Sequence, residues 1–172
     1  MNLDAIVLEM LSSFPHWIAT VMIGATPVFE LRGAIPIALG IYGMDPAAAY
    51  FFAVLGNMLP VIPLLLFLEP VSRFLRRYRI FDIFFTWLFG RTRRNHSERF
   101  ERYGTLALVL FVAIPLPVTG AWTGCAAAFV FGIRFIHAFS AILLGVLIAG
   151  LIVSAVTITG INTIDIIRLY YL

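Results

Sequence analysis

Two charged residues, Glu30 and Arg32, interrupt a stretch of the chain that is otherwise almost entirely apolar. No Asp, Glu, Lys or Arg occurs from Met10 to Phe29, and Gly33 and Pro36 follow the two charges. Ionisable side chains inside a membrane are costly and are usually functional. Arg32 can hold a phosphate or carboxylate in a bidentate fork, and Glu30 can carry a proton. The alternative is a structural ion pair, or a position at the outer interface.

A second group of candidate residues follows Pro115 and Pro117. Thr119 and Thr123 offer hydroxyl donors, and Trp122 offers an aromatic wall that suits a headgroup or a cation. The alternative is that the threonines bond to freed carbonyls and the tryptophan marks an interface. We predict a substrate site made of Arg32, Gly33, Pro36, Asn57, Thr119, Gly120, Trp122 and Thr123, with Glu30 coupling a proton.

Asn57 lies at the centre of a long uncharged run, where it can contact substrate or join helices by hydrogen bonds. His16 and His137 stand apart from other ligand-type residues, so we predict no metal site. The chain has no phosphate-binding loop, dinucleotide fingerprint or nucleophile–base set, and we expect neither a cofactor, nor catalytic residues, nor enzyme activity.

The composition places these residues in a membrane. Of the 172 residues, 62% are hydrophobic and 12% are charged, far from the balance of a soluble domain. The single cysteine, Cys125, excludes an intrachain disulfide and has small apolar neighbours that predict a packed thiol. We predict an all-α integral membrane protein that forms a single membrane domain over residues 1–172.

Proline and glycine divide the apolar chain into broken segments and spans. Residues 14–44 and 104–132 each contain a central break, and each half is too short to cross about 30 Å of hydrocarbon. Both are predicted to be re-entrant helical hairpins. Residues 46–69 and 135–159 are predicted to be spanning helices, the first kinked at its prolines and ended by Glu69-Pro70.

The order hairpin, span, linker, hairpin, span predicts two repeats, at residues 14–69 and 104–160. One span per repeat makes the two halves face opposite ways, which is the inverted-repeat plan of many transporters. Residues 43–56 and 132–145 align without gaps and pair a glycine at each end, and Gly33-Ala34 resembles Gly120-Ala121.

The linker, residues 70–103, holds most of the positive charge. All 12 cations are arginine, and their concentration in this loop predicts that it is cytoplasmic in a multi-pass protein of the cell membrane. Its aromatic part, Phe81 to Phe89, and residues 3–14 are expected to be amphipathic interfacial helices. The arginines match no nucleic-acid-binding module, so lipids rather than nucleic acids are the expected partners.

The motifs Glu30-Leu31-Arg32-Gly33-Ala34-Ile35-Pro36 and Pro115-Leu116-Pro117-Val118-Thr119-Gly120-Ala121-Trp122-Thr123-Gly124 resemble the small multidrug export protein family, which is similar to the DedA superfamily. The resemblance covers roughly residues 20–160. It implies two re-entrant hairpins and a proton-linked transporter or lipid scramblase, with some members proposed to move undecaprenyl phosphate. Glu30 matches the acidic residue of the first DedA hairpin, whereas the arginine of the second DedA hairpin is absent here.

The first functional hypothesis is a proton-coupled transporter or flippase for an anionic amphiphile, such as a phospholipid or polyprenyl-phosphate carrier. The second is a proton-coupled exporter of small cationic drugs, with Glu30 and Trp122 binding the cation. The third is a membrane scaffold without transport. We also expect a homo-oligomer, with a dimer as the simplest form, because the protein is small and has one predicted cavity.

Overall fold

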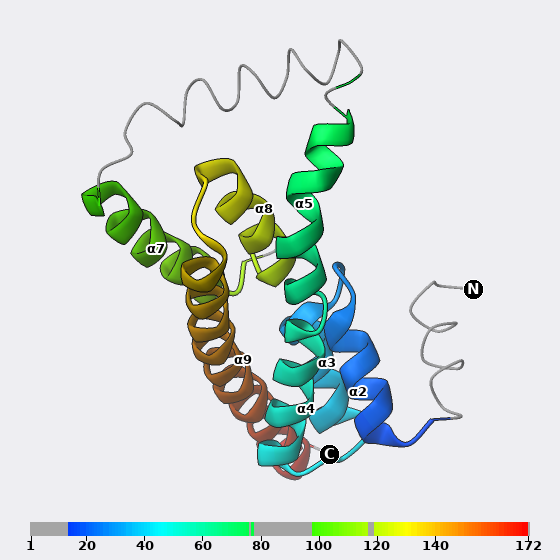
Figure 1. Ribbon diagram of the computed structural model, residues 1–172. Helices are drawn as coiled ribbons and strands as arrows, with labels where there is room; N and C mark the ends of the chain where they lie inside the picture. The colour runs from blue at the N-terminus through cyan, green and yellow to red at the C-terminus, as the bar shows by residue number, and fades with distance from the viewer. Residues whose placement is uncertain (1–13, 76, 78–97, 117–118, 172) are drawn as a thin grey trace. The chain divides into compact units, whose positions relative to one another are not determined.

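The computed structural model describes residues 14–75, 77, 98–116 and 119–171, and the regular elements among them are all helices (Figure 1). Two stretches, Pro46–Leu68 and Phe135–Asn162, are long and apolar enough to cross a membrane. The predicted all-α class with two candidate spans is confirmed. The interfacial helices expected at 3–14 and 81–89 fall outside the described residues, apart from Phe14.

The first hairpin consists of α2 (His16–Ala25) and α3 (Glu30–Gly40), which pack side by side (Figure 1). Helix α2 ends because Thr26 precedes Pro27, and a residue before proline favours extended backbone. Thr26 accordingly has φ −78° and ψ 143°. Its hydroxyl donates to the carbonyl of Ile23 at 2.7 Å and accepts the N–H of Phe29 at 3.3 Å, which satisfies backbone groups at the break.

The break in this hairpin lies earlier than the sequence suggested. Residues Thr26 to Phe29 form it, whereas Glu30 is the first residue of α3 and the helix continues through Pro36. Proline removes only one helical hydrogen bond, the one to the carbonyl of Arg32. Burial of one face of α3 against its neighbours offsets that loss, because packing supplies most of the stability of short helices.

The second hairpin consists of α7 (Glu98–Ala113) and α8 (Ala121–Phe131), which also pack together. Its break is shorter than predicted. Trp122, Thr123 and Gly124 belong to the first turn of α8 instead of the break, and α7 begins inside the predicted linker. Helix α8 ends at Gly132, whose φ of +66° is the left-handed conformation common after a helix.

The first candidate span is divided into α4 (Pro46–Met58) and α5 (Val61–Leu75) by a turn at Leu59 and Pro60. The Asp45 carboxylate caps α4 by accepting the backbone N–H of Ala47 at 3.0 Å. The expected stop at Glu69-Pro70 is wrong, because α5 runs on to Leu75. A single proline costs one backbone bond and is tolerated within an otherwise strong helical sequence.

The second candidate span lies in α9 (Phe135–Tyr171), which continues past the predicted end at residue 159. The chain divides into two compact units. One contains Met1–Asn57 and Ala149–Leu172, and the other contains Met58–Ile148. The first unit therefore holds α2, α3, nearly all of α4 and the second part of α9. The second holds α5, α7, α8 and the first part of α9.

One glycine in each unit allows close helix packing. A Cβ on Gly56 of α4 would collide with the carbonyl oxygen of Val21 in α2. A Cβ on Gly145 of α9 would lie 2.6 Å from the Cβ of Val112 in α7. Each glycine thus lets a long helix approach the first helix of a hairpin, as small residues do in membrane proteins.

The two hairpins also bury their residues in the same order. The first helix of each hairpin buries four positions, with the same spacing in both hairpins. The second helix of each, with the residue before α8 included, buries five positions, again with the same spacing. The buried residues are Ala19, Thr20, Ile23 and Gly24 in α2, matched by Leu108, Val109, Val112 and Ala113 in α7, and Glu30, Leu31, Ala34, Ile35 and Ala38 in α3, matched by Gly120, Ala121, Gly124, Cys125 and Ala128 at α8.

Candidate functional site

Glu30 is the most unusual residue of the first hairpin. Its side chain is only 6% exposed, although it is an acid in an apolar unit. Its φ of +46° makes it the one non-glycine residue with positive φ in the described part of the chain. This conformation costs energy for a side chain with a Cβ, and such residues gather at functional sites. The predicted proton-coupling residue is thus buried in a strained backbone.

The start of α3 holds Glu30 in place. Its backbone N–H donates to the carbonyl of Thr26 at 3.2 Å across the break. Leu31 and Ala34 beside it are buried and anchor the turn that follows. A carboxylate in the first turn of a helix is also favoured by the helix dipole. The fold therefore supports an acid here through both packing and electrostatics.

Arg32 lies two residues after Glu30, in the first turn of α3. Its side chain is half-buried, and Nη2 lies 3.5 Å from the carbonyl oxygen of Val28. Gly33 packs against Phe29, whose Cβ would lie 2.7 Å from a Cβ on Gly33. This glycine serves packing, and it allows Phe29 to lie over the turn that carries both charges.

Asn57 is the second buried polar residue near this turn. It is 1% exposed, and its Oδ1 has no hydrogen-bond partner within the described residues. A Cβ on Gly24 would lie 3.4 Å from the backbone nitrogen of Asn57, which places Asn57 at the end of α2. Thr26, which binds the N–H of Glu30, follows two residues after Gly24. Glu30 and Asn57 therefore both belong to the region around the C-terminal end of α2.

The threonines of the second hairpin bind their own backbone. The Thr119 hydroxyl donates to the carbonyl of Ile114 and accepts the N–H of Leu116 at 3.0 Å. The Thr123 hydroxyl donates to the carbonyl of Gly120 at 3.3 Å. These bonds close the break and the first turn of α8, which is the structural role considered as the alternative for these residues. Gly120 itself is buried at the start of α8.

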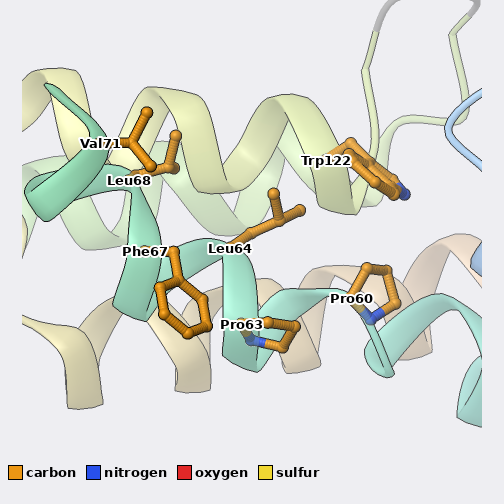
Figure 2. A pocket seen from close by; sticks show the side chains of 7 residues that line it. All are labelled: Pro60, Pro63, Leu64, Phe67, Leu68, Val71 and Trp122. Carbon is orange, nitrogen blue, oxygen red and sulfur yellow. The ribbon is translucent and has the colours of Figure 1, made fainter. Parts of the chain in front are cut away.

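Trp122 lines an apolar cavity of about 430 Å³ between α8 and α5 (Figure 2). The other lining residues all come from the beginning and middle of α5 or the turn before it, namely Pro60, Pro63, Leu64, Phe67, Leu68 and Val71. Trp122 was predicted from the sequence, whereas the α5 residues were not. Their spacing of three and four was the available signal, because it puts them on one helix face.

A ring pair was also missed in the first unit. His16 stacks on Tyr42 with ring centroids 4.7 Å apart and an interplanar angle of 8°. Burial raises the pKa of the Tyr42 phenol above its usual value, so this group stays neutral at physiological pH. The pair joins the start of α2 to the segment after α3. Within the described ranges, no cluster of three His, Cys, Asp or Glu side chains could hold a metal ion.

The predicted site residues thus fall into two groups. Glu30, Arg32, Gly33, Pro36 and Asn57 lie in the first unit, whereas Thr119, Gly120, Trp122 and Thr123 lie in the second. The predicted meeting of the two groups in one paired site stays a prediction.

Comparison with known protein families gives a match. Residues 30–152 match the model of the family described as "Putative small multi-drug export protein". No curated protein and no solved structure matches the chain. The matched region begins at Glu30 and includes Arg32, Asn57 and the whole second hairpin. It also includes most of each candidate span. With most of its length inside the match, this chain belongs to the small multi-drug export protein family.

Proposed function

We propose that this membrane export protein is a proton-coupled transporter that moves an amphiphile with an anionic headgroup across the bilayer. The observation that carries the proposal is Glu30, a buried acid held at φ +46° beside the helix break. A buried carboxylate that is protonated in one state and ionised in another supplies a natural coupling group. Because the family is described by export, a role in transport explains this buried acid better than a purely structural role does.

The matching burial of the two hairpins supports an internal repeat. Gly43 and Gly132, which follow α3 and α8, both have positive φ, at +61° and +66°. Gly56 and Gly145, the other ends of the aligned segments, both allow close helix packing. Because each repeat contains one span, the repeats would be inverted, with both hairpins re-entrant and the 70–103 linker cytoplasmic. The burial pattern pairs Gly120 with Glu30 rather than with Gly33.

An anionic headgroup is favoured by the charges around the breaks. Arg32 supplies a cation one turn from the Thr26–Phe29 break. Neither Thr119 nor Thr123 is required for charge recognition, since both bind backbone carbonyls. The proposal therefore assigns the headgroup to Arg32 and the proton to Glu30.

A cationic substrate is the second candidate, and Asn57 favours it. Its buried Oδ1 lacks a donor in the described part of the chain, and a ligand with N–H groups would satisfy it. Together with the Glu30 carboxylate it would provide acceptor oxygens suited to an ammonium group. In this alternative, Arg32 is structural and proton exchange at Glu30 drives the export of a cationic drug.

Reconstituted vesicles test the two candidates. Fluorescent phosphatidylglycerol, with dithionite to bleach the outer leaflet, reports lipid movement, and ethidium release reports cation export, each with and without a pH gradient. Glu30→Gln and Arg32→Ala should each reduce lipid movement at least tenfold, while Glu69→Gln and Arg134→Ala should leave it unchanged. Unchanged lipid movement in both site variants would refute the anionic-lipid proposal. Ethidium release lost only in Glu30→Gln would establish the cationic alternative.

A scaffold role has a different signature in the same assay. If the protein only organises lipids or partners, the wild type should show no movement of either probe above empty vesicles. The four variants would then differ in thermal stability alone.

A further inference from the structure

The cavity beside Trp122 belongs to a different compact unit from Glu30 and Arg32, the residues assigned to transport. It is lined by α5 and the first turn of α8, both in the second unit, whereas Glu30 and Arg32 belong to the first. Its side chains are all apolar, and those of Phe67 and Val71 are 62% and 50% exposed. The cavity is therefore an open groove along the end of a candidate span and the helical turn that follows it. In a membrane protein the medium that reaches such a surface is lipid.

The groove has the length of one leaflet. From Pro60 to Val71 the axial rise is about 16 Å at 1.5 Å per residue. One leaflet contributes about 15 Å of hydrocarbon. The lining positions 60, 63, 64, 67, 68 and 71 recur once per helical turn, so the groove runs along the helix axis in a single stripe (Figure 2). This shape fits one extended alkyl chain.

The stripe ends at a cation. Phe74 continues the spacing by one turn and is exposed, and Arg77 follows three residues later. The Arg77 guanidinium carbon lies 5.5 Å from the centroid of the Phe74 ring, a cation–π contact that holds the charge at this end of α5. Arg73 precedes it on α5, and further arginines follow in the chain. Positive charge at the polar end of an apolar groove complements an anionic headgroup.

We propose that the α5–α8 groove binds one alkyl chain of an anionic phospholipid, with Arg77 at its headgroup. The binding site requires neither Glu30 nor transport. The lipid fills the apolar stripe and satisfies the charge at its end, so it should prefer anionic over zwitterionic headgroups. A second copy of the protein is the competing occupant, and it would exclude lipid from the groove.

Fluorescence of Trp122 tests the proposal directly. The variant Trp17→Phe/Trp87→Phe leaves Trp122 as the single tryptophan. It is reconstituted in vesicles containing rising fractions of chain-brominated phosphatidylglycerol or chain-brominated phosphatidylcholine. Half-maximal quenching should need an about fivefold lower fraction of the anionic lipid, the ratio that one arginine near an anionic headgroup supplies. Arg73→Gln/Arg77→Gln or high salt should remove that preference.

A variant that fills the groove tests the alkyl-chain site, and a variant outside the groove is its control. Val71→Phe in the same background should reduce quenching by both lipids, because the phenylalanine ring would occupy the stripe. Leu66→Phe, on an exposed part of α5 outside the groove, should not. Equal quenching by the two lipids would overturn the headgroup assignment. No quenching, or quenching insensitive to Val71→Phe, would overturn the alkyl-chain site. Because Glu30→Gln should leave all these results unchanged, failure here is distinct from failure of the transport proposal.

Discussion

The two hairpins have the same pattern of burial but differ in chemistry. In the first, the position that starts the buried face of the second helix is Glu30, a buried acid with positive φ. In the second, the corresponding buried position is Gly120, and the nearby hydroxyls bind backbone carbonyls. The same helical plan thus accommodates both a buried acid and a break whose hydroxyls bind backbone carbonyls. Packing glycines are common to both halves of the chain, whereas the residue types at the two breaks differ.

The largest expected difference between the hairpins is the side of the membrane from which each is reached. In a Cys125→Ser background, single cysteines at Val28 and Leu116 report the two breaks, since both residues are exposed. An inverted repeat predicts that a membrane-impermeant maleimide labels one from outside intact cells and the other only after permeabilisation. Labelling of both from the same side would contradict the inverted arrangement.

The packing glycines should be equally important in both halves. Gly56→Ala and Gly145→Ala each place a Cβ against the first helix of a hairpin, and each should destabilise the protein by about 1–3 kcal/mol through overpacking. Thermal unfolding in detergent measures the loss. Gly160→Ala is the matched control, because nothing lies within 4 Å of its added Cβ. A loss in only one half would show that the two units do not share a packing plan.

The buried residue that follows each packing glycine is polar in one half of the chain and apolar in the other. Asn57 follows Gly56 and has a buried acceptor that receives no hydrogen bond from the residues described, whereas the apolar Val146 follows Gly145. Asn57→Val should stabilise the protein by about 1 kcal/mol, and Val146→Asn should destabilise it by about 1–3 kcal/mol. If Asn57 contacts substrate, Asn57→Val will also lose transport despite its greater stability. Destabilisation by Asn57→Val would instead show a structural hydrogen bond.

The smallest expected effect isolates the backbone strain at Glu30. Glu30→Gly and Glu30→Ala both remove the carboxylate, but only glycine accepts φ +46° without cost. The glycine variant should therefore have an unfolding free energy about 1 kcal/mol higher than that of the alanine variant. It should accordingly unfold at a higher temperature. Ala126 is an exposed helical position of α8, and its replacement by glycine should instead lower the unfolding free energy. An alanine variant as stable as the glycine variant at position 30 would exclude the strain.

Several features of the fold follow from residue order alone. Hydropathy and the scarcity of charge predict an all-helical membrane protein with spans near 46–68 and 135–159, and the structure confirms two candidate spans. Proline before a helix break acts locally, so the end of α2 at Thr26-Pro27 needs no tertiary information. Where local signals compete with packing, the sequence misleads. Pro36 and Pro70 both lie inside helices, because the surrounding residues stabilise helix more than one lost bond destabilises it.

The candidate residues for chemistry can be identified from the sequence alone. Glu30 and Arg32 are charges in an apolar segment whatever the fold, and their cost in a membrane marks them. Only the tertiary structure shows that Glu30 is buried at φ +46° and that Asn57 lies near the end of α2. Likewise, the α5 stripe becomes a groove only because α8 places Trp122 beside it. Burial and cavities arise from segments distant in the chain, so no local pattern contains them.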